Sequence, residues 1–291
     1  MQDKTDPLSF HFSLVALDLD GTLLRNDKSI SERAAKAVRA VEASGRYVAI
    51  TTGRHPNSAL RFFERMDALG PKSLAVCFNG SAVIDLCAFK KEGAPDSLFG
   101  TLWEDTADAQ ELALLDRETS AAGLDLHAYS KTNSLVLEKV TGYSTREIIH
   151  AKVAYTDRWN FKKGHESERY YKAVATGPKD LIDDFRPEIS NKVRDSFEIM
   201  RTDDNFLEFI PHHNSKGSAL IKLCSVLGVN IGECVAFGDA ENDLVMIKNA
   251  GLGVAMGNAM DSLKKAADYV TLTNMQDGVA VVLEQLMRED N

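Results

Sequence analysis

The chain is poor in cysteine and has no long hydrophobic run. Cys77, Cys87, Cys224 and Cys234 show no CxxC spacing among 291 residues, and all but Cys87 lie in apolar surroundings. This pattern favours buried free thiols over a metal cluster or a disulfide. The start of the chain, Met1 to Phe10, is charged and holds a proline, and no later stretch reaches membrane-spanning length. We therefore expect a cytoplasmic protein without a signal peptide or a membrane anchor.

Positive charge is also scarce. Lys and Arg total 34 against 43 Asp and Glu, which gives a net charge of −9, and the few basic doublets lie far apart. Binding to nucleic acid or to an anionic membrane is therefore disfavoured. The composition, 44% hydrophobic and 26% charged, is that of an ordinary globular protein, and the length suits about two domains. A small molecule is the expected partner. The sequence leaves the oligomeric state open and is compatible with a monomer.

Two carboxylates and a glycine close the first apolar run. Leu14 to Leu17 is short enough for a buried strand, and Asp18-Leu19-Asp20-Gly21-Thr22 follows it directly. Residues two apart on an extended strand point to the same side, so Asp18 and Asp20 are expected to share one site. Two carboxylates at one spot repel each other unless a cation or a shared proton intervenes. The alternative is a hairpin turn at Asp20-Gly21 with solvated acids, and it is weakened because a helix is predicted next.

Strands and helices alternate through the first third of the chain. A capping box of Ser29 and Glu32 precedes apolar residues at helical spacing from Ala34 to Val41. Further strands are predicted at Tyr47 to Thr51 and Leu74 to Phe78, with a helix between them. This order predicts the α/β class, with a Rossmann-like parallel sheet covered on both faces. Such sheets place their sites at the carboxyl ends of the strands.

The alternation breaks off in the middle of the chain. Residues 83–205 mix helices and strands, are more polar, and hold the longest irregular stretch, Gly142 to Arg169. We expect an inserted α+β domain there. A strand at Phe206 to Ile210 then resumes the first pattern, so residues 1–82 and 206–291 are expected to form one core domain.

Polar residues follow several core strands and open one core helix. Thr52 comes after the second strand, Lys216 opens a helix, and Asp239, Asn242 and Asp243 follow the strand from Cys234 to Phe237. Taken singly, Thr52 suits a helix cap, Lys216 a solvated lysine, and the two acids a capped turn. Packing or turn roles serve the nearby Arg54 and Asn79 equally well.

Jointly, these residues suit phosphoryl transfer from a monoester. The strand-end and helix-start positions bring three acids, a lysine and a hydroxyl to one edge of the sheet. Hard oxygen ligands suit Mg²⁺, which prefers a few carboxylates together with phosphate and water. The lysine and the helix N-termini offer positive charge and amide donors to phosphate. A metal-bound carboxylate is the best nucleophile available.

The same pieces resemble the motifs of the haloacid dehalogenase-like (HAD) hydrolase superfamily. They match DxDGT at Asp18 to Thr22, the strand-end threonine of Thr52-Gly53-Arg54, the lysine of Ser215-Lys216-Gly217, and GDxxND at Gly238 to Asp243. The Thr52-Gly53-Arg54 sequence, the long insert and the ending Asn274 to Val279 resemble the Cof-type branch, whose inserted α+β domain is a C2B cap. Over the insert the likeness is only architectural.

The resemblance implies a role for each matching residue. Asp18 would attack phosphorus and become an aspartyl phosphate, and Asp20 would act as general acid and then general base. Mg²⁺ would be held by the Asp18 side chain, the Asp20 main-chain carbonyl and Asp239. Asp243 would join this metal site, directly or through water, or position Lys216.

The remaining matches would hold the substrate. Thr52, Gly53 and Lys216 would bind the transferring phosphoryl group, and Asn242 would contact phosphate or substrate. We therefore expect a Mg²⁺-dependent phosphatase of small phosphorylated metabolites, with sugar phosphates favoured by the family likeness. A phosphomutase of the same fold and a phosphometabolite-binding regulator without turnover are the alternatives.

Overall fold

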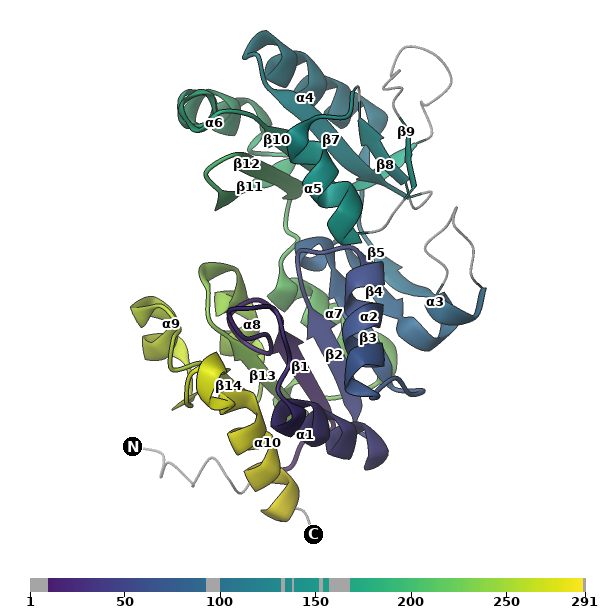
Figure 1. Ribbon diagram of the computed structural model, residues 1–291, viewed down its shortest axis with the longest axis vertical. Helices are drawn as coiled ribbons and strands as arrows, with labels where there is room; N and C mark the ends of the chain where they lie inside the picture. The colour runs from purple at the N-terminus through teal and green to yellow at the C-terminus, as the bar shows by residue number, and fades with distance from the viewer. Residues whose placement is uncertain are drawn as a thin grey trace. The chain divides into compact units, whose positions relative to one another are not determined.

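The chain folds into two compact units (Figure 1). The computed structural model describes residues 10–92, 100–131, 134–137, 139–151, 154–156 and 168–289. One unit consists of Met1–Lys91 and Ser215–Asn291, and the other of Glu92–Asn214. The predicted class, an α/β parallel-sheet core with an α+β insertion, is confirmed.

A mainly parallel sheet forms the centre of the first unit. Within the first unit its strands follow the order β15-β14-β13-β1-β2-β3-β4. The neighbours from β15 to β3 pair parallel, and β3 and β4 pair antiparallel. The bounds are β1 Leu14–Asp18, β2 Tyr47–Thr51, β3 Ser73–Cys77, β4 Ala82–Asp85, β13 Cys234–Gly238, β14 Leu252–Ala255 and β15 Tyr269–Val270. Strand β1 lies between β2 and β13 and is buried along its whole length, as its apolar run predicts.

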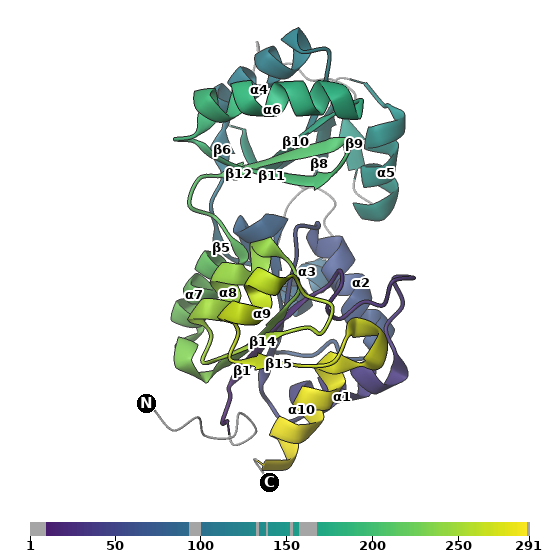
Figure 2. The same ribbon diagram turned by 90° about the vertical axis from the view of Figure 1, so that its left-hand side faces the viewer.

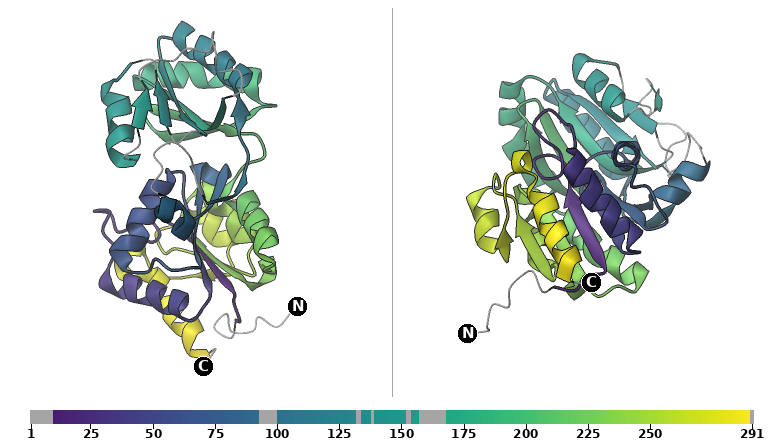
Figure 3. Two further views of the ribbon diagram at one scale, coloured as in Figure 1. Left: turned by 90° about the vertical axis from the view of Figure 1, so that its right-hand side faces the viewer. Right: turned by 60° about the horizontal axis from the view of Figure 1, so that its bottom comes forward.

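Helices cover both faces of this sheet (Figures 2 and 3). Helices α1, α2 and α10 lie on one face and α7, α8 and α9 on the other. The bounds are α1 Glu32–Ala43, α2 Pro56–Met66, α3 Leu86–Glu92, α7 Lys216–Leu227, α8 Leu244–Asn249, α9 Asp261–Ala266 and α10 Gly278–Glu289. None of the helices in the described part of the chain is long and apolar enough to cross a membrane.

The cap of α1 differs from the predicted one. The Ser31 side chain accepts a hydrogen bond from the Ala34 N–H, so Ser31 caps the helix. Ser29, the expected cap, donates from both its backbone N–H and its hydroxyl to the Asp27 carboxylate. This local bond fixes a turn before the helix, and the helix starts later than predicted.

The second unit is a mostly antiparallel sheet with helices. Its sheet has the order β11-β12-β10-β7-β8-β9, and β6 also pairs with β10. The bounds are β5 Thr101–Glu104, β6 Ala107–Asp108, α4 Ala109–Ala121, β7 Asp125–Ser130, β8 Ser134–Leu137, α5 Gly142–Ala151, β9 Ala154–Thr156, β10 Arg169–Thr176, α6 Lys179–Val193, β11 Phe197–Asp203 and β12 Phe206–Pro211. The stretch predicted to be irregular from Gly142 thus begins with a helix.

Strand β12 belongs to the second unit, and here the sequence prediction was wrong. It pairs antiparallel with β10 and β11, so it does not resume the parallel core. At the other junction β4 pairs with β3 and stays in the first unit. Both unit boundaries therefore lie nine residues later than predicted, at Lys91/Glu92 and Asn214/Ser215. An apolar run reveals a strand, but not which strand it pairs with.

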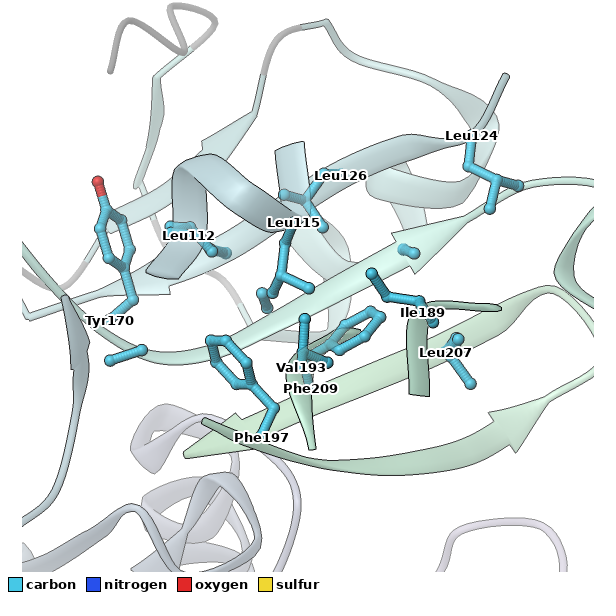
Figure 4. Close-up of a cluster of buried hydrophobic side chains, with 14 of the residues drawn as sticks. Leu112, Leu115, Leu124, Leu126, Tyr170, Ile189, Val193, Phe197, Leu207 and Phe209 are labelled. Carbon is cyan, nitrogen blue, oxygen red and sulfur yellow. The ribbon is translucent and has the colours of Figure 1, made fainter. Parts of the chain in front are cut away.

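Helices α4 and α6 pack on one face of the second sheet (Figure 4). Leu112 and Leu115 come from α4, Ile189 and Val193 from α6, and all are almost completely buried in one cluster with Phe209 of β12. This cluster gives the insertion a hydrophobic core of its own, as expected for a separate domain.

Phe209→Ala is expected to lower the free energy of unfolding of the second unit by about 3–5 kcal/mol, because it leaves a cavity in that core. Urea denaturation measures the change. Val140→Ala is the control, since Val140 is 47% exposed, and should stay within about 0.5 kcal/mol of the unchanged protein. Equal effects of the two substitutions would contradict the assignment of this core.

Candidate active site

Four segments meet at the carboxyl edge of the first sheet. Asp18 ends β1, Thr52 directly follows β2, and Asp239 directly follows β13. Because β1 runs parallel between β2 and β13, these three ends share one edge. Lys216 begins α7 and reaches the same place through its side chain.

The ammonium of Lys216 lies between two carboxylates. Its Nζ is 2.5 Å from Oδ1 of Asp18 and 2.7 Å from Oδ1 of Asp243, and all three side chains are buried. The distances are those of charge-assisted hydrogen bonds. Lys216 is therefore a fixed positive charge inside the site and not the solvated lysine that its position alone would suggest.

Asp239 completes a group of three carboxylates. One oxygen each from Asp18, Asp239 and Asp243 lies within 4.8 Å of the others. Gly21 and Gly238 permit this close approach: a Cβ at Gly21 would lie 2.2 Å from Oδ2 of Asp239, and one at Gly238 would lie 2.4 Å from Cβ of Asp243. Gly21 also has a φ of +88°, which favours glycine.

The crowding of negative charge shifts the titration of these groups. Burial raises the pKa of Asp18 well above its usual value, Lys216 opposes the rise, and Asp243 adds to it. Burial and Asp243 likewise raise the pKa of Asp239 against the hydrogen bond from Thr22. Burial alone would lower the pKa of Lys216, but Asp18 and Asp243 outweigh it and raise it. The site therefore holds more carboxylates than its one ammonium can balance.

Asp243 holds both Lys216 and its own loop. One of its oxygens accepts from Lys216, and the other accepts from the backbone N–H groups of Asp239 and Ala240 at 3.0 and 3.1 Å. Both oxygens are therefore engaged within the protein. The roles expected of Asp243, which are metal binding and the positioning of Lys216, stay predictions.

Asp20 is not one of the three grouped carboxylates, and the expectation that it shares a site with Asp18 stays a prediction. The Arg54 guanidinium donates to both oxygens of Asp20, at 2.9 and 2.6 Å, and Lys28 donates to one at 2.8 Å. Burial opposes ionisation of Asp20, but Arg54 and Lys28 outweigh it and lower its pKa. Asp20 is thus held as a carboxylate here, and its metal contact through the main-chain carbonyl stays a prediction.

Thr52 lies beside the loop that follows β3. Its hydroxyl oxygen accepts from the Arg54 N–H at 3.2 Å, and its carbonyl accepts from the Asn79 N–H at 3.1 Å. A Cβ at Gly53 would lie 2.8 Å from Nδ2 of Asn79. Asn242 donates to Oδ1 of Asn79 at 3.4 Å. The structure thereby brings Thr52, Gly53 and Asn242 together around Asn79.

Three residues of the site had no predicted role. The Thr22 hydroxyl donates to Oδ1 of Asp239 at 3.0 Å, and Arg54 and Lys28 bind Asp20. Two sequence signals could have indicated a role in the site: Thr22 is part of DxDGT, and Arg54 closely follows Thr52. Lys28 gives no such signal, because it lies in an exposed turn.

A family model described as haloacid dehalogenase-like hydrolase matches residues 15–283. The chain belongs to this hydrolase family. The 5-amino-6-(5-phospho-D-ribitylamino)uracil phosphatase YcsE of Bacillus subtilis is 32% identical over 92% of this chain and 92% of its own length. A putative phosphatase of Streptococcus pyogenes is 29% identical over 92% of this chain and 95% of its own.

Solved structures of HAD-like hydrolases share the fold. One from Bacteroides thetaiotaomicron has a TM-score of 0.82 and 27% identity, and the match covers 94% of this chain and 99% of that one. A sugar phosphatase of HAD subclass IIB has a TM-score of 0.71 at 19% identity, covering 94% and 99%. The resemblance to the superfamily and to its Cof-type branch is confirmed, and the protein is a phosphatase enzyme.

Asp18→Asn is expected to raise the stability of the metal-free protein above about pH 5. A raised pKa in the folded state means that the folded protein binds the Asp18 proton more tightly than the unfolded chain does. Stability is therefore lost as the pH rises from about 3.9, the usual value for Asp, through the raised pKa. The substitution removes this loss.

Urea denaturation in chelator at several pH values between about 5 and 8 tests this expectation. The dependence of stability on pH should be weaker in Asp18→Asn than in the unchanged protein. A variant that is less stable than the unchanged protein at about pH 8 would contradict it.

Proposed function

We propose that this phosphatase is Mg²⁺-dependent and hydrolyses small phosphorylated metabolites, sugar phosphates above all, through an aspartyl phosphate on Asp18. The observation that carries the proposal is the buried Lys216 ammonium, 2.5 Å from Asp18, within a group of three carboxylates. A nucleophilic carboxylate and a fixed cation at one point are what attack on a phosphate monoester requires.

The donor set fits Mg²⁺. Three carboxylates against one ammonium leave two uncompensated negative charges if all are ionised, which a divalent cation balances. Carboxylate oxygens are hard ligands of the kind that Mg²⁺ prefers. Asp18 and Asp239 would hold the metal, with Asp243 acting through a water because both its oxygens are already engaged. When bound, Mg²⁺ would neutralise charge on the phosphoryl oxygens.

Several side chains contribute to the first chemical step, the transfer of the phosphoryl group to Asp18. An oxygen of Asp18 forms a bond to phosphorus as the bond from phosphorus to the leaving oxygen breaks. The Lys216 ammonium and the Thr52 hydroxyl stabilise the oxygens of the transferring group. Gly53 and Asn242, which both approach the Asn79 side chain, would line the phosphate position. Water then attacks the phosphorus of the aspartyl phosphate and restores Asp18.

Asp20 would donate the proton to the leaving oxygen. As general acid it must carry a proton, whereas Arg54 and Lys28 here favour its carboxylate. A substrate phosphate offers Arg54 a competing anionic partner. We therefore expect the bond between Arg54 and Asp20 to loosen when substrate binds, so that Asp20 can take up the proton that it donates to the leaving oxygen.

The relatives support a particular kind of phosphate ester. Two proteins of Bacillus subtilis, 32% and 30% identical to this chain, are named 5-amino-6-(5-phospho-D-ribitylamino)uracil phosphatases. Their substrate carries its phosphate on a ribityl chain, which is a sugar alcohol. Phosphate esters of sugars and sugar alcohols are therefore the class we propose for this protein.

Hydrolysis of p-nitrophenyl phosphate by the purified protein should require Mg²⁺ and stop in excess chelator. Asp18→Asn should reduce turnover on the order of 10³-fold or more, because it removes the nucleophile. Asp261→Asn, which changes an exposed carboxylate in the same unit, is the matched control and should keep full activity. Full activity in chelator, or in Asp18→Asn, would refute the mechanism.

Product analysis separates this proposal from a phosphomutase. With sugar phosphates and phosphorylated sugar alcohols, we expect one inorganic phosphate for each ester consumed. Phosphate release is detected colorimetrically, and the sugar products are separated by chromatography. An isomeric sugar phosphate formed without inorganic phosphate would show a mutase instead.

A further inference from the structure

Two of the four cysteines touch each other away from the carboxylates. Cys224 lies in the last turn of α7, and Cys234 is the first residue of β13. Their Sγ atoms are 3.3 Å apart, and both are free thiols, as the sequence predicts. A disulfide bond is about 2.0 Å long, so the sulfurs need to approach by only about 1.3 Å to form one.

The two thiols differ in character. Cys224 keeps 3% exposure and Cys234 none. The hydrogen bond between them lowers the pKa of Cys224, whereas this bond and burial raise the pKa of Cys234. Both thiols are therefore buried, but Cys224 has the lower pKa of the two and the small remaining exposure, so we expect it to react first. Cys234 is placed to act as the second thiol.

The other two cysteines have no such neighbour. Cys77 is a fully buried thiol in β3, and burial raises its pKa. Cys87 is partly exposed in α3, and its thiol donates to the Gly70 carbonyl at 3.0 Å. The buried Cys77 and the more accessible Cys87 therefore serve as internal references for the reactivity of Cys224 and Cys234.

We propose that Cys224 and Cys234 are an oxidation site. When a hydroperoxide oxidises them, they form a reversible disulfide with each other. The Cys224 thiolate attacks one peroxide oxygen, the O–O bond breaks, and the departing oxygen takes up a proton and leaves as alcohol or water. Cys224 is then a sulfenic acid. The Cys234 sulfur attacks it, the S–O bond breaks, and the hydroxyl leaves with the Cys234 proton as water. Two thiols are oxidised, and one hydroperoxide is reduced.

A short loop joins the two elements that carry the cysteines. Gly228, with a φ of +67°, ends α7, and the 3₁₀ turn η2 (Ile231–Glu233) leads into β13. The disulfide would tie the end of α7 to the start of β13. These are the elements whose other ends carry Lys216 and lead into Asp239, but the proposal does not depend on the catalytic function.

Peptide mapping of the folded, full-length protein tests the proposal. The protein is treated with hydrogen peroxide, its remaining thiols are alkylated after denaturation, and its peptides are identified by mass spectrometry. We expect the free thiols to fall from four to two, with a Cys224–Cys234 link within one chain that dithiothreitol removes. Cys87→Ser should form the same link.

Cys234→Ser isolates the first step. It should leave a sulfenic acid on Cys224 that dimedone captures, and no intramolecular link should form. The proposal is overturned if Cys224 and Cys234 are both alkylated in full after peroxide has oxidised Cys87. It is also overturned if dimedone labels Cys87 but not Cys224 in Cys234→Ser. Neither readout uses phosphatase activity, so failure here leaves the proposed function untouched.

Discussion

The buried ammonium of Lys216 between Asp18 and Asp243 is the interaction on which the rest of the site depends. Removing the ammonium would leave its two carboxylate partners buried and uncompensated, at a cost of about 3–5 kcal/mol. The three residues come from β1, α7 and the 3₁₀ turn η3 (Glu241–Asp243), so their contact fixes how these elements meet. Burial raises the pKa of Asp18, and the neighbouring carboxylates add to the rise. This is a cost to stability that a binding site for cations and phosphate explains.

The loop after β1 is held by segments far away in the sequence. The Asn258 side chain donates to the Gly21 carbonyl at 2.8 Å, and the Asn274 N–H donates to the Asn258 side chain at 2.9 Å. The Asn274 amide also donates to the Leu24 carbonyl at 2.8 Å. The C-terminal region thus donates hydrogen bonds to the loop that contains Asp20 and Thr22. These bonds give Asn274, which is part of the resemblance to the Cof-type branch, a structural role in holding that loop.

Most of the first unit could be predicted from the sequence, because periodicity and glycine stops mark β1, α1, β2 and α7 directly. The gathering of Asp18 and Asp239 followed from strand ends and parallel order, and that of Lys216 from its place at a helix start. The pairing of β12 could not be predicted, because its apolar residues suit either sheet. Nor could the contact between Cys224 and Cys234, which depends on how α7 packs beside β13. Local patterns identify elements, whereas contacts between elements depend on tertiary packing.

The position of Asp20 shows where the alternation of side chains along a strand ends. Side chains two apart share a side only while the chain stays extended, and β1 ends at Asp18. Beyond it the backbone turns: the Thr22 N–H donates to the Leu19 carbonyl, and Gly21 takes a positive φ. The Asp20 side chain there binds Arg54 and Lys28. The pKa of Asp18 is raised and that of Asp20 is lowered, which is the reverse of what a nucleophile and a general acid require. The proposed mechanism therefore requires the charges of the cation and the substrate phosphate to change both pKa values.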